Sequence, residues 1–239
     1  MAKDIDKDHL NEIVETGIDT FQNIVAGFLP GIHVFHELIN VGNKLKTKRL
    51  LNFAQNFKSA IYELKNETIN DSNFTKEDFI EVFEKVLFQV QNTKSELKLE
   101  RFRNILLNQL VDPQEDIDLM NKYIKILNEL NDIQIHMIID FRDWQNMNQK
   151  IKNIVRAYSG DIGMKQPDDY IIERLSNRVG YLVKKSDLEF YFNELIVLGL
   201  VRNIRNEITY GGADGLQNEY EITPFGLSFI GIIEISNDK

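Results

Sequence analysis

Cysteine is absent from this 239-residue sequence. Its absence excludes disulfides, thiolate nucleophiles and cysteine metal sites together, and it suits a reducing compartment such as the cytoplasm. Proline is scarce as well, with four residues, so few positions forbid a helix. Residues 1–6 mix charges and lack an apolar core, so we expect no secretory signal there.

Sequence motifs for nucleotide binding and for hydrolysis are also missing. The chain has no Walker loop, no Gly-x-Gly-x-x-Gly turn after a strand and no Gly-x-Ser-x-Gly elbow. His136 stands in an apolar stretch, where we interpret it as a histidine at the edge of the core with a hydrogen-bond partner. We therefore expect a protein that is not an enzyme and holds no cofactor.

The overall charge limits the partners that the chain can bind. A formal net charge of −9 disfavours general binding to a phosphate backbone, although a local basic patch can still exist. The composition is otherwise typical of a soluble globular protein. Abundant Ile, Asn and Lys are typical of an AT-rich genome, which indicates a bacterial or phage source.

Most of the chain shows the 3.6-residue periodicity of amphipathic helices. The pattern breaks at Pro30-Gly31, at the polar segment 66–73 and at Asp112-Pro113, where Asp112 fits a helix cap. A further cap at Asn131-Asp132 predicts a short helix that ends near Phe141. The expected buried stripe of the central part comprises Phe79, Phe83, Val86, Leu87, Val90, Leu99, Phe102, Leu106 and Leu110.

One segment has the form of a membrane-surface anchor. Ile24–Ile39 is nearly free of charge but shorter than the roughly 20 residues of a spanning helix, and Pro30 interrupts it. An apolar helix followed by basic residues fits an anionic membrane surface. The alternative is a buried helix with a basic end. The basic residues that follow the segment are Lys44, Lys46, Lys48 and Arg49.

The same region contains the best candidate for a metal site. His33, His36 and Glu37 can share one helix face, and histidine with carboxylate can bind zinc. The zinc-protease pattern fails, however, because Asn40 stands where the second histidine belongs. The alternative is two histidines beside an apolar stripe, and we expect no metal there.

Residues 183–235 show the clearest local plan. Ser186 and Glu189 fit a capping box at the start of a helix, and Gly199 marks its end. The predicted inward face of this helix comprises Leu188, Tyr191, Phe192, Leu195 and Ile196, and its outward face comprises Asp187, Glu189, Phe190, Asn193, Glu194 and Val197.

Two strand-like runs follow, up to Tyr210 and over 219–222, joined through a glycine-rich turn at 211–215. Thr223-Pro224 then fits the start of a last helix, with Thr as N-cap and Pro next. Helix, hairpin and helix in this order resemble the winged-helix family. The wider layout is similar to bacterial and prophage proteins that place a helical part before a winged helix.

The resemblance implies DNA binding, which the residues support only in part. A recognition helix presents Arg, Lys, Asn or Gln to the bases, whereas the outward face here holds carboxylates and a single Asn. The candidate DNA contacts are Lys184, Lys185, Asn193, Arg202 and Arg205. The candidate contacts to a protein partner are Phe190, Glu194, Val197, Phe229 and Ile233.

The expected fold is mainly α: a helical bundle over 1–111, a connecting helix over 112–131, and a winged-helix domain with a small hairpin wing over 132–239. We expect a non-enzymatic interaction or regulatory protein that binds protein partners, with a homodimer as one option. The alternatives are a DNA-binding transcriptional regulator and a membrane-associated effector in phage defence. The expected location is the cytoplasm, or the inner face of the membrane for the effector.

Overall fold

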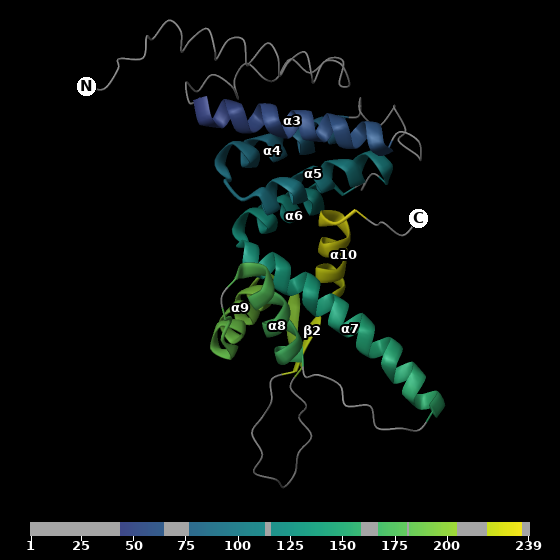
Figure 1. Cartoon of the computed structure of the whole chain (residues 1–239). Coiled ribbons are helices and arrows are strands. Elements are labelled where there is room, and N and C mark those ends of the chain that lie inside the picture. The colour runs from purple at the N-terminus through teal and green to yellow at the C-terminus, as the bar shows by residue number, and fades with distance from the viewer. Residues whose placement is uncertain are drawn as a thin grey trace, which may run out of the picture. The chain divides into compact units, whose positions relative to one another are not determined.

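The computed structural model describes residues 44–64, 77–112, 116–158, 167–180, 182–204 and 219–235. These residues are mainly helical, with a small two-stranded antiparallel sheet, as expected (Figure 1). They fall into two compact units, one comprising residues 1–129 and 232–239 and the other residues 130–231. The helix expected to connect two domains, 112–131, thus belongs mostly to the first unit.

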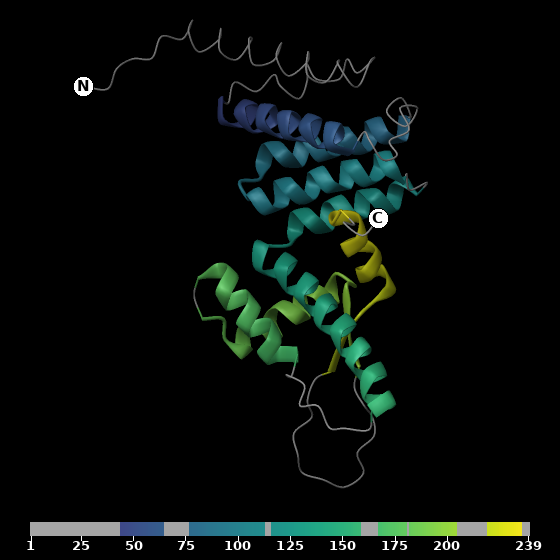
Figure 2. The ribbon, with the colours of Figure 1, turned by 45° about the vertical axis from the view of Figure 1, so that its right-hand side comes forward.

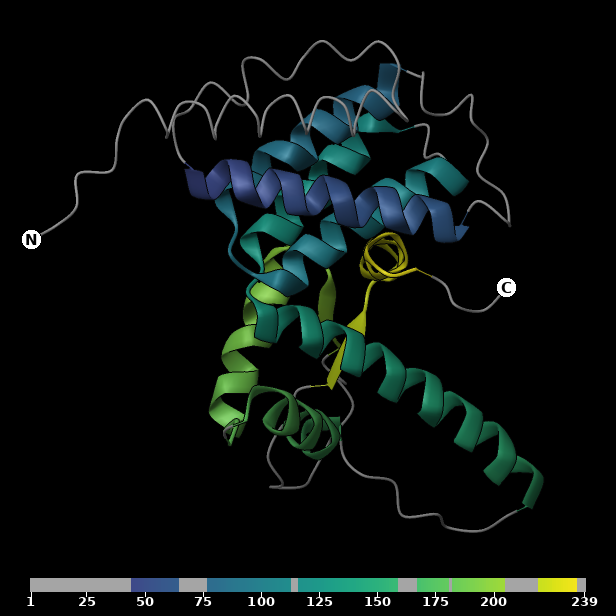
Figure 3. The ribbon, with the colours of Figure 1, turned by 45° about the horizontal axis from the view of Figure 1, so that its top comes forward.

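The first unit is built from the helices α3 (Lys44–Leu64), α4 (Glu77–Asn92), α5 (Glu96–Val111) and α6 (Ile117–Glu129). α4 packs against all three of the others, and α5 also contacts α3 and α6. Figures 2 and 3 show these helices from two further directions. The residues of the predicted central stripe are buried, except for Leu99, which is half-buried.

Short polar side chains set the boundaries between these helices. Ser95 caps α5 by accepting a hydrogen bond from the Lys98 N–H at 3.1 Å, so residues 93–95 separate α4 from α5. The α6 cap is Asp116, whose Oδ1 accepts from the Leu119 N–H at 2.9 Å. The prediction of Asp112 as this cap was wrong: Asp112 lies at the C-terminal end of α5.

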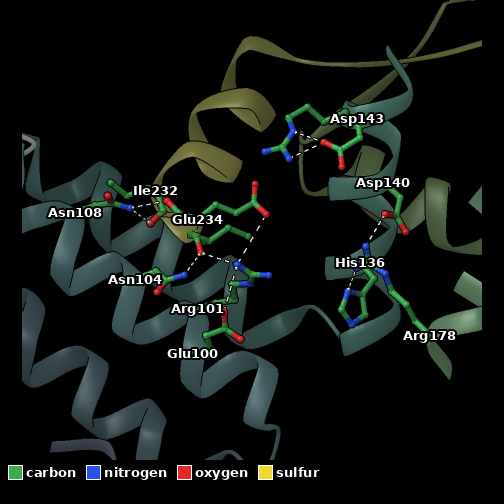
Figure 4. A network of polar contacts seen from close by, with 12 residues as sticks. Glu100, Arg101, Asn104, Asn108, His136, Asp140, Asp143, Arg178, Ile232 and Glu234 are labelled. Atoms are coloured by element: carbon green, nitrogen blue, oxygen red, sulfur yellow. Dashed lines mark hydrogen bonds and ion pairs between the residues drawn. The ribbon is translucent and has the colours of Figure 1, made fainter. Parts of the chain in front are cut away.

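The end of the last helix, α10 (Pro224–Ile233), is bound by α5 within the first unit. The Asn108 side-chain amide donates to the carbonyl oxygens of Ile232, at 2.8 Å, and Glu234, at 3.0 Å (Figure 4). These are carbonyls that the end of a helix leaves without partners inside the helix. α5 therefore supplies side-chain donors for the C-terminal end of α10.

The second unit contains α7 (Asp132–Tyr158), α8 (Pro167–Val179), α9 (Lys185–Val197) and the start of α10. α7 packs against α8, and α8 packs against α9. The far half of α7 extends away from α8 and α9 (Figures 1 and 3). The predicted end of this helix near Phe141 was therefore wrong.

The start of α7 was predicted correctly and contains a reciprocal capping box. Asn131 Oδ1 accepts from the Gln134 N–H at 2.9 Å, and Gln134 Oε1 accepts from the Asn131 N–H at 2.8 Å. The polar segment after Phe141 continues as helix because nothing in residues 142–158 breaks it: the segment has neither proline nor glycine.

The sheet pairs β1 (Val201–Ile204) with β2 (Glu219–Ile222). The pairing is antiparallel, with Val201 opposite Ile222 and Ile204 opposite Glu219. The glycine-rich turn predicted between the strands lies outside the described residues. β1 contacts α9 and β2 contacts α7, and the opposed pair Val201 and Ile222 is buried in the core of the second unit.

Gly199 ends α9 as predicted, because its φ of +75° is a conformation that glycine adopts without steric cost. The Gly199 N–H donates to the Ile196 carbonyl at 2.9 Å, and the Leu200 N–H donates to the Leu195 carbonyl at 3.0 Å. This pair of bonds is the Schellman motif.

The start of α10 was also predicted correctly. Thr223 Oγ1 accepts from the Gly226 N–H at 2.9 Å, and Pro224 occupies the first helical position. The same hydroxyl donates to the Gly199 carbonyl at 2.6 Å. Thr223 therefore caps one helix and binds the turn that ends another.

Candidate functional site

α9 begins earlier than the sequence pattern suggests. Its first residue is Lys185, and Asp187 Oδ2 accepts from the Lys184 N–H at 3.2 Å, so Asp187 takes the acidic position of the capping box. Ser186 lies inside the first turn, and the prediction that Ser186 caps the helix was wrong. The physical reason is that Asp187 competes for the same role two positions before Glu189.

The inward face of α9 holds the helix in place through aromatic packing. Phe192 is fully buried and stacks on Tyr220 of β2, with ring centroids 4.2 Å apart. Its ring also meets Phe141 of α7 edge to face at 5.2 Å. Leu188 and Leu195 are buried on the same face, as predicted. Packing of this inward face against α7 and β2 thus fixes the orientation of α9.

The opposite face of α9 exposes apolar side chains. Phe190 is 59% exposed and Val197 is 87% exposed, and both lie on one stripe because they are seven residues apart. Asn193 stands between them and is exposed. We call Phe190, Asn193 and Val197 the α9 face. Both apolar residues had been predicted as contacts to a protein partner.

Three other residues predicted at such a contact are not exposed in this way. Phe229 and Ile233 are fully buried, because α10 is apolar on most of its faces and packs into the chain. Glu194 is half-buried, and its carboxylate accepts a hydrogen bond from the Gln134 side chain of α7. The outward assignment of Glu194 was therefore wrong, and Phe229 and Ile233, which were predicted as partner contacts, belong to the core.

The candidate DNA contacts are only partly available. Lys184 and Lys185 are exposed at the start of α9. Arg202 on β1, in contrast, forms an ion pair with Glu221, directly opposite on β2. Glu221 neutralises the positive charge that a phosphate would need, and Arg205 lies outside the described residues.

A buried charge cluster joins α7 to α8, and the sequence reasoning missed it. The Asp140 side chain is fully buried, and its Oδ1 accepts from Arg174 Nε and from Arg178 Nη2, both at 2.9 Å. The Arg178 guanidinium also contacts His136 Nδ1, and Arg174 donates to the Tyr170 hydroxyl at 2.7 Å. Figure 4 shows the Asp140, His136 and Arg178 part of this cluster. His136 has the hydrogen-bond partner expected of it.

The electrostatics of the cluster are dominated by burial. Desolvation raises the pKa of the Asp140 carboxyl, although the charges of Arg178 and Arg174 act to lower it. Burial alone lowers the pKa of Arg174, but Asp140 and Tyr170 outweigh it and the net direction is upward. Asp140 Oδ2 is buried and has no hydrogen-bond partner among the described residues.

A sequence signal for this cluster does exist. Asp140 interrupts the apolar run from Ile138 to Phe141, and a carboxylate at such a position needs cationic partners. Arg174 and Arg178 are four residues apart, so they share one face of α8. The two observations indicate that Asp140 needs cationic partners and that α8 can supply two, but they do not tell that α7 and α8 lie against each other.

The basic cluster of the predicted membrane anchor lies at the start of α3. Lys48 is exposed, and Arg49 donates to the Gln91 carbonyl at 2.9 Å, so Arg49 serves partly to hold α3 against α4. Lys46 is half-buried, and the side chain of Lys44 is outside the described residues, as is all of Ile24–Ile39. Within the described helices, no segment is both long and apolar enough to cross a membrane.

The metal candidates His33, His36 and Glu37 lie outside the described residues. The part of the chain that the structure describes holds no group of three or more His, Cys, Asp or Glu residues placed to bind a metal ion. Comparisons with known protein families, with curated proteins and with solved structures each found no match for this chain.

Proposed function

We propose that this chain is a non-enzymatic interaction or regulatory protein, and that residues 130–231 form a winged-helix domain that binds a protein partner through the α9 face. The order of α7, α8, α9 and the antiparallel pair β1–β2 supports the winged-helix assignment. Fold does not fix function, so the argument for protein binding rests on the side chains of α9.

The observation that carries the proposal is the exposure of Phe190 and Val197 on one stripe of α9. The opposite face of this helix is held in place by the stacking of Phe192 on Tyr220. Apolar side chains that stand together in water are typical of protein interfaces, and aromatic residues are enriched at their centres. Asn193 between them provides a polar group that can fix the register of a partner.

The charges of α9 indicate the chemistry of the partner. After Lys185 the helix has no basic residue, and Glu189 is exposed beside the α9 face. A partner that offers apolar side chains flanked by Lys or Arg complements this surface, because opposite charges at the rim favour association. Nucleic acid, with its regular negative charge, does not.

The test uses a photo-crosslinking amino acid placed at position 190, in cells of the source organism. We expect a discrete protein adduct that a Val197→Glu substitution abolishes. The matched control carries the crosslinker at Leu227, an exposed apolar residue on α10 in the same unit. An adduct of equal yield at both positions, or one that survives Val197→Glu, would contradict the proposal. Unchanged melting temperatures establish that the variants fold.

A DNA-binding regulator is the second candidate. It is favoured by the exposure of Lys184 and Lys185 at the start of α9 and of Asn193 in its middle. A gel-shift titration across salt concentrations tests it. Replacement of Lys184 and Lys185 by Ala should then weaken binding and reduce its salt dependence. The double variant Arg202→Ala/Arg205→Ala tests the wing in the same way. Equal weak binding by all three proteins rules this function out.

A further inference from the structure

The two guanidinium groups at the α7–α8 contact are held in an unusual way, because both use the same oxygen of Asp140. Arg174 engages this oxygen through Nε and Arg178 through Nη2. A carboxylate that binds one arginine through both of its oxygens would occupy the planar fork of that arginine. Here the carboxylate binds one nitrogen of each arginine, while Arg174 Nη1 donates to Tyr170 and Arg178 Nη1 contacts His136. The two guanidinium groups are therefore held close together, and each keeps one nitrogen that no described residue binds.

Both arginines remain accessible from solvent. The side chains of Arg174 and Arg178 are 39% and 32% exposed, although the carboxylate beneath them is fully buried. No described residue accepts from Arg174 Nη2 or from Arg178 Nε. The Tyr170 hydroxyl, which accepts from Arg174, keeps its own proton available for donation.

The local charge favours an anion. Two guanidinium groups face one carboxylate, which leaves one positive charge in excess. Asp143 on α7 also acts on this cluster, but it is bound by Arg142 at 2.7 Å, so these two charges offset each other. The excess charge stands beside a buried contact, where it is less screened than on an open surface.

We propose that Arg174, Arg178 and the Tyr170 hydroxyl form a binding site for a tetrahedral oxyanion, such as a phosphate group, with Asp140 as the residue that positions both guanidinium groups. Arginine forks match the geometry of phosphate oxygens, and positions fixed in advance reduce the entropy lost on binding. The site is separate from the α9 face, and neither assignment depends on the other.

The experiment is a titration of the full-length protein with inorganic phosphate, followed by isothermal calorimetry and by the Nε–Hε NMR signals of the arginines. Sodium chloride keeps the ionic strength constant. We expect saturable binding that perturbs the signals of Arg174 and Arg178. A parallel titration with phenyl phosphate distinguishes free phosphate from a phosphate monoester. The compound that binds with the higher affinity indicates which of the two the site recognises.

Two double variants separate a built site from general attraction to positive charge. Arg174→Lys/Arg178→Lys keeps both charges and the pairing with Asp140 but removes the forks, so affinity should fall by about tenfold or more. Lys122→Gln/Lys125→Gln removes two exposed charges from α6 and should leave affinity unchanged. Conservation of the charge also keeps Asp140 paired, so the lysine variant is expected to fold.

The opposite pattern would overturn the proposal. Full affinity in the lysine variant and lost affinity in the glutamine variant would show nonspecific attraction. The absence of saturable binding by both phosphate compounds would show that the arginines serve only to neutralise Asp140. A melting curve for each variant confirms that a loss of binding is not a loss of fold.

Discussion

Asn104 on α5 donates through Nδ2 to the carbonyl oxygen of Ile233 at the end of α10, 3.0 Å away, although 129 positions separate the two residues in the chain. Asn104 is buried, and the carbonyl that it binds belongs to the last turn of a helix. Without this donor the carbonyl would lie in the interior with no partner in its own helix. Together with Asn108, Asn104 binds the C-terminal end of α10 within the first unit (Figure 4).

Replacement of Asn104 by Leu should therefore destabilise the protein by about 1–3 kcal/mol, because it leaves the buried Ile233 carbonyl with only the longer hydrogen bond from Arg101 Nη1, at 3.4 Å. Urea denaturation followed by circular dichroism measures the change. Asn52→Leu on the exposed face of α3 is the matched control and should change stability by less than about 0.5 kcal/mol. Equal effects of the two substitutions would show that the Asn104 bond contributes nothing.

Three glycines of the second unit should respond differently to alanine. At Gly199 a Cβ meets no atom within 4 Å but the φ of +75° is strained for alanine, so Gly199→Ala should cost about 1–2 kcal/mol. At Gly226 a Cβ would overlap the Leu200 carbonyl oxygen, and Gly226→Ala should destabilise more. At Gly231, inside α10 and unobstructed, alanine should stabilise by up to about 1 kcal/mol.

Thermal melts of the three glycine variants give this order directly. Gly226→Ala is expected to lower the melting temperature and Gly231→Ala to raise it, so the test depends on the direction of each change and not on its size. A Gly226→Ala variant as stable as Gly231→Ala would mean that the close approach of α10 to Leu200 is wrong.

Features that depend on neighbouring residues in the chain were predictable from the sequence. The caps at Asn131 and Thr223 and the glycine stop at Gly199 each follow from bonds that span a few residues. Where the prediction was wrong, two local candidates competed, as with Asp187 against Ser186. Local chemistry cannot rank two groups that can each satisfy the same orphan N–H groups.

Features that depend on the packing of distant elements were not predictable in this way. Gln134 and Glu194 are 60 positions apart, and Asp140 and Arg178 are 38 apart. Periodicity places Glu194 on the flank of α9, but it does not tell whether another helix covers that flank. For this reason Leu188, Phe192 and Leu195 of the predicted inward face are buried, whereas Tyr191 and Ile196 are only half-buried. The partner of Glu194 and the charge cluster at Asp140 were not predicted.

Two phenylalanines two positions apart on α9 should differ sharply in their importance for stability. Phe192→Ala removes a fully buried ring that stacks on Tyr220 and should cost about 3–5 kcal/mol. Phe190→Ala removes an exposed ring and should change stability by less than about 0.5 kcal/mol. Chemical denaturation of both variants measures the difference. Similar losses in the two would show that α9 is rotated about its axis.

The pH dependence of stability provides a test of the Asp140 cluster. Burial raises the pKa of the Asp140 carboxyl in the folded state above the value of about 3.9 in the unfolded chain. The folded state therefore binds the proton more tightly, and stability due to this group is present at low pH and lost as the pH rises through the folded pKa. Relative to Asp140→Asn, which cannot ionise, the wild type should become less stable as the pH increases from about 4.

Glu81 on α4 supplies a control with the opposite sign. Hydrogen bonds from the Lys85 and Asn121 side chains lower the pKa of Glu81. The wild type should therefore gain stability relative to Glu81→Gln as the pH rises through the same range, because the ionised form is favoured in the folded state. Free energies of unfolding from urea titrations at several pH values measure both differences. A wild-type curve that instead rises with pH relative to Asp140→Asn would show that Arg174 and Arg178 outweigh the burial of Asp140, since paired guanidinium groups lower the pKa of a carboxyl.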